Sequence, residues 1–104
     1  MGYSGDLSAS FNRVLTRLSA RQGVIGVIIC DSEGFTLDSN ISPEQSEFIS
    51  AHVNEIISRV NDVTKAAERL SIGGLTAISI ELETKELYIV PDKAGFTIVI
   101  LREN

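Results

Sequence analysis

The 104-residue sequence contains one cysteine, Cys30, one histidine, His52, and no tryptophan. A single cysteine excludes an internal disulfide, which fits a reducing compartment. Basic residues are also scarce, because 9 lysines and arginines stand against 14 acidic residues and the net charge is −5. Nucleic-acid binders need a basic footprint, and anionic membranes attract basic segments. We therefore expect no nucleic-acid partner and no direct membrane partner.

Long apolar runs and targeting signals are missing as well. No run approaches the ~20 residues of a membrane-spanning helix. Residues 1–6 lack the basic and apolar regions of a secretory signal peptide. We therefore expect a cytoplasmic protein without direct membrane insertion. The length suits one domain over residues 1–104, and 43% hydrophobic residues are enough for one core.

The sequence holds no catalytic or metal-binding motif. His52 would act as a general base only with a nucleophile beside it. Cys30 has no positive neighbour in sequence to lower its pKa, so we interpret it as a buried small hydrophobe. The acidic residues lack the spacing of a calcium loop, and there is no glycine-rich phosphate loop. We expect no enzyme activity, no cofactor and no metal ion.

The first half of the chain predicts a helix followed by two strands. Apolar residues spaced three and four apart indicate a helix over residues 6–21, with Gly23 as its stop. Residues 24–31 are apolar at both odd and even positions, which predicts a strand covered on both faces. A polar turn then leads to a second strand over residues 35–39.

The second half predicts a long helix and three strands. Ser42 is a candidate N-cap, with Pro43 at the first helical position and Gln45 completing a capping box. The helix should run to about residue 70 or 71, where Gly73 and Gly74 follow. Strand patterns cover residues 75–83, 86–90 and 96–101. Short turns between neighbouring strands require antiparallel pairing. The order is α-β-β-α-β-β-β, an α/β (α+β) fold.

The long helix has more apolar surface than its own sheet requires. Seven residues step by four and three in a heptad seam: Ile49, Val53, Ile56, Val60, Val63, Ala67 and Leu70. With flanking residues the apolar arc covers roughly 180°, whereas ~100° suffices to cover a sheet. We expect a dimer in which the two copies of this helix meet. The expected interface residues are Ile49, His52, Val53, Ile56, Ile57, Val60 and Val63. The alternative is a helix buried more deeply in one copy.

The strand pattern over residues 75–83 suggests a second contact between copies. It alternates, contains no proline and has few charges along its middle. At a sheet edge such a strand would expose unpaired backbone groups that recruit another strand. We expect Thr76, Ile78 and Ile80 in this interface. The alternative is an interior strand with two neighbours.

A basic stripe recurs every four residues on the first helix, at Arg13, Arg17 and Arg21. One interpretation is contact with an acidic partner. The other is a solvated helix face, with the last arginine favourable to the helix dipole.

Three local patterns occur in order between residues 7 and 101. They are G-V-I-G-V-I-I with S-E-G at residues 23–34, the capped helix from Pro43, and Y-I-V-P-D-K with F-T-I-V-I at residues 88–100. Together they resemble the roadblock/LC7 domain family. The resemblance implies a profilin- or longin-like five-stranded antiparallel sheet with helices on both faces. It also implies a dimer, homotypic or with a related domain, in which the third strands pair and the long helices lie side by side.

The resemblance further implies a protein that is not an enzyme. Members act as dynein light chains, as scaffolds in signalling complexes and as regulators of Ras-like small GTPases. We therefore expect a dimeric scaffold or regulator of a Ras-like small GTPase. A motor light chain that holds a segment of a larger subunit is the first alternative, and a small-molecule sensor is the second. No residue matches a transferable GTPase-activating motif.

Overall fold

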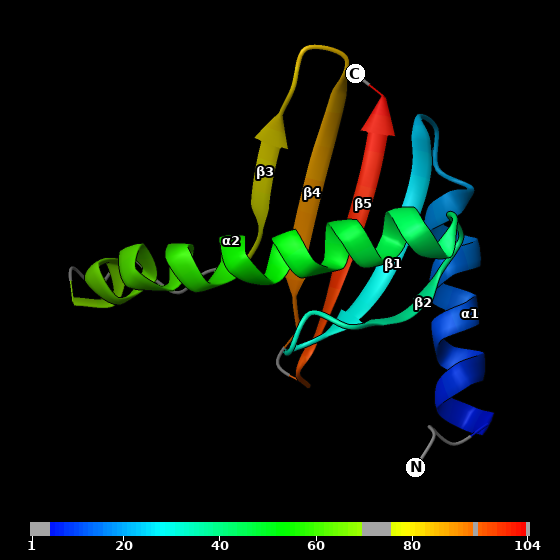
Figure 1. Ribbon diagram of the computed structural model, residues 1–104, viewed down its shortest axis with the longest axis horizontal. Helices are drawn as coiled ribbons and strands as arrows, with labels where there is room; N and C mark the ends of the chain where they lie inside the picture. Colours follow the sequence, from blue (N-terminus) through cyan, green and yellow to red (C-terminus); the bar gives the residue numbers. More distant parts are fainter. Residues whose placement is uncertain (1–4, 70–75, 93, 104) are drawn as a thin grey trace.

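The computed structural model describes residues 5–69, 76–92 and 94–103. Seven elements follow one another along this part of the chain (Figure 1). They are α1 (Gly5–Ser19), β1 (Val24–Asp31), β2 (Thr36–Ser39), α2 (Pro43–Arg69), β3 (Ile78–Glu81), β4 (Lys85–Pro91) and β5 (Phe96–Glu103). This order confirms the predicted α-β-β-α-β-β-β succession.

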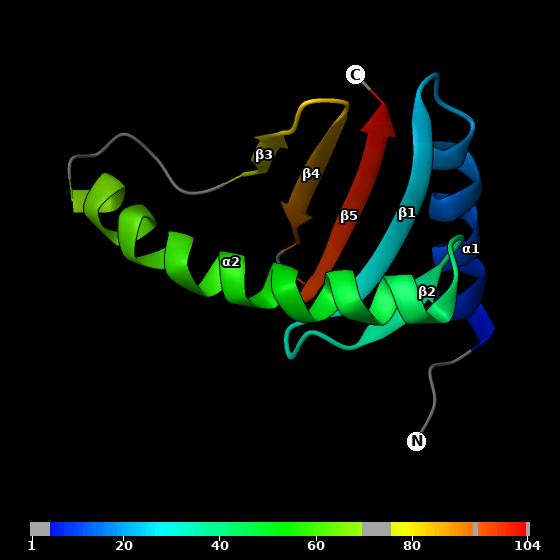
Figure 2. The same cartoon turned by 45° about the horizontal axis from the view of Figure 1, so that its top comes forward.

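The five strands form one antiparallel sheet in the order β2-β1-β5-β4-β3. The helices lie on opposite faces, with α2 crossing one face and α1 standing against the other near β1 and β2 (Figure 2). The five-stranded sheet with helices on both faces is therefore confirmed. The sheet has two edges, and β3 forms one of them.

Strand β1 is covered on both faces of the sheet. Its five residues 26–30 are all buried. Because side chains alternate along a strand, Ile28 and Cys30 enter the core under α2, while Val27 and Ile29 enter the core under α1. The continuous apolar run thus predicted a central strand correctly.

The two cores are separate clusters on the two faces of the sheet. Under α2 the buried residues are Ile28, Cys30, Val53, Ile89 and Val99. Under α1 they are Phe11, Leu15, Val27 and Ile29, and the ring of Phe11 meets the ring of Phe96 edge to face, with centroids 5.3 Å apart. Each helix is therefore held to the sheet by its own core.

The local turn and cap chemistry follows the prediction. The Oγ of Ser42 accepts a hydrogen bond from the backbone N–H of Gln45 at 3.2 Å, as an N-cap does. In the β1–β2 turn, Oδ1 of Asp31 accepts bonds from the N–H groups of Glu33 and Phe35 at 2.9 and 3.0 Å. Gly34 takes a φ of 91° there, a conformation that glycine adopts without strain.

Some element bounds differ from the prediction. Helix α1 ends at Ser19, because the N–H of Arg21 bonds the carbonyl of Leu18 at 3.1 Å and tightens the chain into a turn. Gly23, with a φ of 83°, lies in that turn rather than directly after the helix. The predicted glycine stop of the long helix, at residues 73–74, lies outside the described residues.

The strand predicted over residues 75–83 is shorter. It spans Ile78–Glu81, since Leu82 already bonds back to the carbonyl of Lys85 at 2.8 Å and begins the hairpin turn. Thr76 and Ala77 precede the strand, and residue 75 lies outside the described residues. Strands β4 and β5 are longer than predicted because they pair from Lys85 with Glu103 to Pro91 with Thr97.

Candidate functional site

The two side chains with reactive chemistry have different surroundings. Cys30 is buried, and burial raises the pKa of its thiol above 9.0. The charge of Asp31 acts in the same direction, while a hydrogen bond from Ser50 opposes them. His52 is exposed on α2, with Nδ1 2.9 Å from the carbonyl oxygen of Phe48. Burial keeps the Cys30 thiol in its protonated, weakly nucleophilic form.

The raised pKa of Cys30 predicts a loss of stability in alkali. Unfolding exposes the thiol, which then ionises near pH 9, whereas the folded state keeps the proton. The contribution of this thiol to the free energy of unfolding is therefore complete below pH 9. It is lost as the pH rises from 9 through the folded pKa. Urea unfolding at pH 8 and pH 10 should show a loss of up to about 1.4 kcal/mol that Cys30→Ala does not share. Equal losses in both proteins would contradict the burial of the thiol.

Among the described residues, no three histidine, cysteine or acidic side chains gather to hold a metal ion. No helix in the described ranges has the length and apolar character needed to cross a membrane.

The first candidate surface is the open edge of β3. This strand pairs with β4 on one side, from Ile78 with Ile89 to Glu81 with Glu86. Ile78 and Ile80 point to the α2 face and pack partly against the core, while Ser79 and Glu81 are exposed. The outer side of β3 therefore presents its backbone groups to a further strand.

The second candidate surface is the far part of α2. With 27 residues, the helix is about 40 Å long at 1.5 Å per residue. Five strands spaced ~4.8 Å apart span only about 20 Å between the outer axes. The helix starts at the β2 side and crosses the strands, so its C-terminal part projects past β3 (Figures 1 and 2). Roughly half of α2 therefore has none of its own sheet beneath it.

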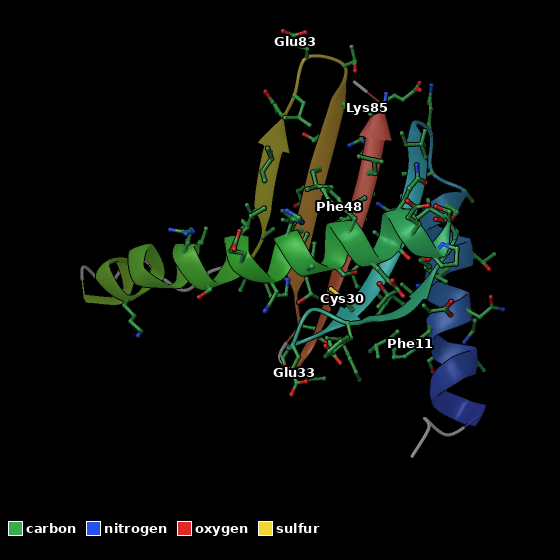
Figure 3. The ribbon with its side chains drawn as sticks, viewed as in Figure 1. Phe11, Cys30, Glu33, Phe48, Glu83 and Lys85 are labelled. Atoms are coloured by element: carbon green, nitrogen blue, oxygen red, sulfur yellow. The ribbon has the colours of Figure 1, made fainter. Side chains whose placement is uncertain are left out.

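The third candidate surface is a hollow on the same face, which we call the α2 trough. It has a volume of about 480 Å³. Its apolar lining consists of Ile25, Ile41, Phe48, Ile49 and Leu101, with Glu44, Gln45 and Lys85 at the rim. Figure 3 labels Phe48 on α2 and Lys85 at the end of β4. The trough lies between the N-terminal half of α2 and the nearby strand ends.

Phe48 is the largest exposed apolar group of the trough. Its side chain is 67% exposed, and its ring lies 4.4 Å from the ring of His52. Water-exposed phenylalanine next to other apolar side chains is typical of a surface that another protein covers. The α2 trough, the projecting part of α2 and the β3 edge therefore form the candidate functional site.

The structure corrects one member of the predicted helix interface. Val53 is 1% exposed and belongs to the core between α2 and the sheet, so it offers no surface to a second copy. Ile49, Ile56 and Ile57 pack partly against the same core, and Val60 is half-buried. His52 is exposed beside Phe48. The side chain of Val63 lies outside the described residues.

The predicted edge-strand and arginine residues are placed as follows. Ile78 and Ile80 lie in β3 and are half-buried. Thr76 is exposed but precedes the strand, so the structure corrects its placement. The three predicted arginines are exposed, and Arg21 lies beyond the end of α1.

Ile25 and Leu82 are among the exposed apolar residues that were not predicted. Ile25 is 41% exposed although its strand was expected to be covered on both faces. The β1–β5 register shifts between Val24 and Gly26, and Ile25 falls in this irregularity. Leu82 is 56% exposed in the β3–β4 turn. The one local signal for Ile25 is the glycine that follows it within the strand.

The described residues thus form a small α/β domain with an open sheet edge at β3 and a helix that projects past this edge. The chain belongs to the Roadblock/LC7 domain family, whose family model matches residues 11–102. This result confirms the resemblance noted in the sequence.

Solved structures of the same fold are similar over almost the whole chain. The gliding protein MglB from Thermus thermophilus superposes with a TM-score of 0.83 at 15% identity, covering 99% of this chain and 78% of that one. Myxococcus xanthus MglB gives 0.76 at 15% identity over 100% and 77% of the two chains. A Streptomyces avermitilis Roadblock/LC7 domain gives 0.73 at 15% over 88% and 76%. At this identity the likeness shows the fold.

Proposed function

We propose that this chain is a non-enzymatic scaffold or regulator that acts as a dimer and binds a Ras-like small GTPase in the cytoplasm. The observation that carries the proposal is the length of α2, which projects about 20 Å past β3 with no sheet of its own beneath it. Its neighbour at that edge, β3, is open to a further strand. A single added chain would cover both.

A second copy fits both features at once. Two β3 strands paired antiparallel about a two-fold axis would extend the sheet directly under the projecting part of α2. The same operation brings the partner's α2 toward the α2 trough, where Phe48 is exposed. Two strand edges and two helix flanks would bury more than ~1,000 Å², the size of a stable interface. Assembly is also described for one similar structure, an MglB in a tetrameric arrangement.

The GTPase part of the proposal rests on the family. The resemblance to this family implies a role like that of the members that regulate Ras-like GTPases. The matched structures include MglB from two bacteria. A ten-stranded sheet would give such a partner a rigid platform. Binding, rather than transfer of a catalytic residue to the GTPase, is the expected mode, because no residue here matches a GTPase-activating motif.

The experiment titrates the purified dimer with a Ras-like GTPase from the same organism, loaded with GDP or with a non-hydrolysable GTP analogue. Calorimetry should give at least a tenfold preference for one nucleotide state, together with a change in the rate of hydrolysis or nucleotide exchange. Absence of binding in both states would contradict the GTPase proposal. Capture of a long coiled-coil subunit instead would favour the motor light chain.

A further inference from the structure

The face of the sheet that carries α1 is only partly covered. Helix α1 contacts β1 and β2 and leaves β4 and much of β5 open on its side. Two hollows of about 460 and 210 Å³ follow one another along the flank of α1 that faces these strands. We call this pair the α1 groove. It lies on the face opposite the α2 trough, so the proposed dimer does not cover it.

The floor of the α1 groove is apolar. It consists of alternate residues of β5, Ile98 and Ile100, and of Tyr88 on β4, which is paired with Ile100 and 37% exposed. The wall on α1 is formed by Val14 and Leu18, which are half-buried. At the end nearer the start of α1, the rings of Phe11 (Figure 3) and Phe96 close the groove.

The occupant of this groove must satisfy its own backbone hydrogen bonds. Strands β4 and β5 are paired on both sides within the sheet, so their backbones have no edge to offer an extended peptide. A helix pairs its own N–H and C=O groups and needs only an apolar stripe to pack against the floor. The eight residues of β5 span about 26 Å, the length of roughly 18 helical residues.

The charges beside the α1 groove indicate which kind of helix would bind there. At 100° per residue, Arg17 lies about 60° from Val14 on the flank of α1 that faces the groove, and Arg13 lies about 100° from Val14. Arg21 lies in the turn after the helix. All three arginines are exposed, and Arg21 lines the groove. This row is basic although the whole chain carries −5. An occupant with acidic residues beside its apolar stripe would complement it.

The opposite wall does not cancel this charge. Two acidic residues line the groove, Glu86 and Asp92. Glu86 is already engaged, with Oε1 3.6 Å from Nη1 of Arg102 and Oε2 accepting a bond from Ser79 at 3.2 Å. Asp92 lies at the far end from Arg21. Among the described residues that line the groove, the arginines of α1 and of the turn after it therefore face no row of free carboxylates.

We propose that the α1 groove binds an amphipathic, acidic helix of another protein. The helix lies along β5 with leucine- or isoleucine-type residues on Ile98, Ile100 and Tyr88, and with aspartate or glutamate beside the arginine row. A second copy of this chain is a poorer occupant, because its amphipathic α2 is placed on the opposite face in the dimer. The groove itself is formed by one copy, whereas the exclusion of a second copy as occupant rests on the proposed dimer.

The test is a selection of random 18-residue peptides on the immobilised, full-length protein. Enriched peptides should show apolar residues at i, i+3, i+4 and i+7 with acidic residues on one flank. Amide chemical shifts on adding the best peptide should change in α1, β4 and β5 and not in α2. No enrichment, enrichment of basic or β-branched extended peptides, or shifts centred on α2 would overturn the proposal.

Matched variants sharpen the test. Arg21 lines the groove, and Arg21→Glu should lower the affinity for the best peptide about tenfold. Tyr88→Glu should lower this affinity at least ~thirtyfold. Arg59→Glu makes the same charge change at an exposed position of α2, and the affinity for the peptide should change less than about twofold. Equal effects of Arg21→Glu and Arg59→Glu would overturn the groove as the site. So would equally strong binding of a peptide that copies residues 43–69, or binding of phosphatidylserine vesicles in place of peptides.

Discussion

Phe48→Glu is expected to convert the dimer into a folded monomer. The side chain is 67% exposed in the single chain and lies in the α2 trough, so the substitution removes little from the monomer core. In the dimer it would place a charge inside an apolar contact. Loss of a buried aromatic anchor costs about 3 kcal/mol or more, which raises the dimer dissociation constant at least ~100-fold. Sedimentation equilibrium over a range of concentrations measures this change directly.

Phe35→Glu is the matched control. Phe35 is 65% exposed, almost as much as Phe48, but it lies in the β1–β2 turn, away from β3 and the α2 trough. This variant should keep the mass of the dimer, and both variants should keep the circular dichroism of the parent. A dimer that survives Phe48→Glu, or one that Phe35→Glu dissociates equally, would place the interface elsewhere.

The elements of this fold were predictable because their signals are local. The apolar run of β1 indicates burial on both faces without reference to any partner strand. The Ser42 cap marks the start of α2 to the residue. The bounds that differ, at the end of α1 and in β3, depend on backbone bonds of turns that the side-chain pattern does not encode.

The contacts that join distant segments were not predictable in the same way. Asn40 accepts a bond from the N–H of Val27 at 2.7 Å and donates one to Oγ of Ser19 at 2.7 Å. These bonds connect the end of α1, the middle of β1 and the loop before α2. Nothing in the spacing of the three residues indicates that they meet, because the meeting depends on the packing of both helices.

In the candidate site, too, local features were predictable and contacts between distant segments were not. Heptad spacing predicted that one face of α2 is apolar, but it does not say which neighbour that face meets. The sheet order β2-β1-β5-β4-β3 puts Val53 over the core and leaves Phe48, one flank away, exposed. The α1 groove likewise depends on β5 lying between β1 and β4, an arrangement that no local pattern states. The arginines were visible in the sequence, but their groove was not.

Val53→Asp tests whether Val53 packs on its own sheet or faces a second copy. The side chain is 1% exposed and packs in the core with Ile28 and Ile89, so an aspartate there would be buried without a partner. An uncompensated buried charge costs about 3–5 kcal/mol, a large part of the 5–15 kcal/mol that stabilises a typical domain. We expect loss of the folded state or a large fall in the urea midpoint. Measuring it in the Phe48→Glu background removes any contribution from dimer dissociation. A stable, folded Val53→Asp monomer would show instead that Val53 faces a second copy and that α2 packs on its own sheet through other residues.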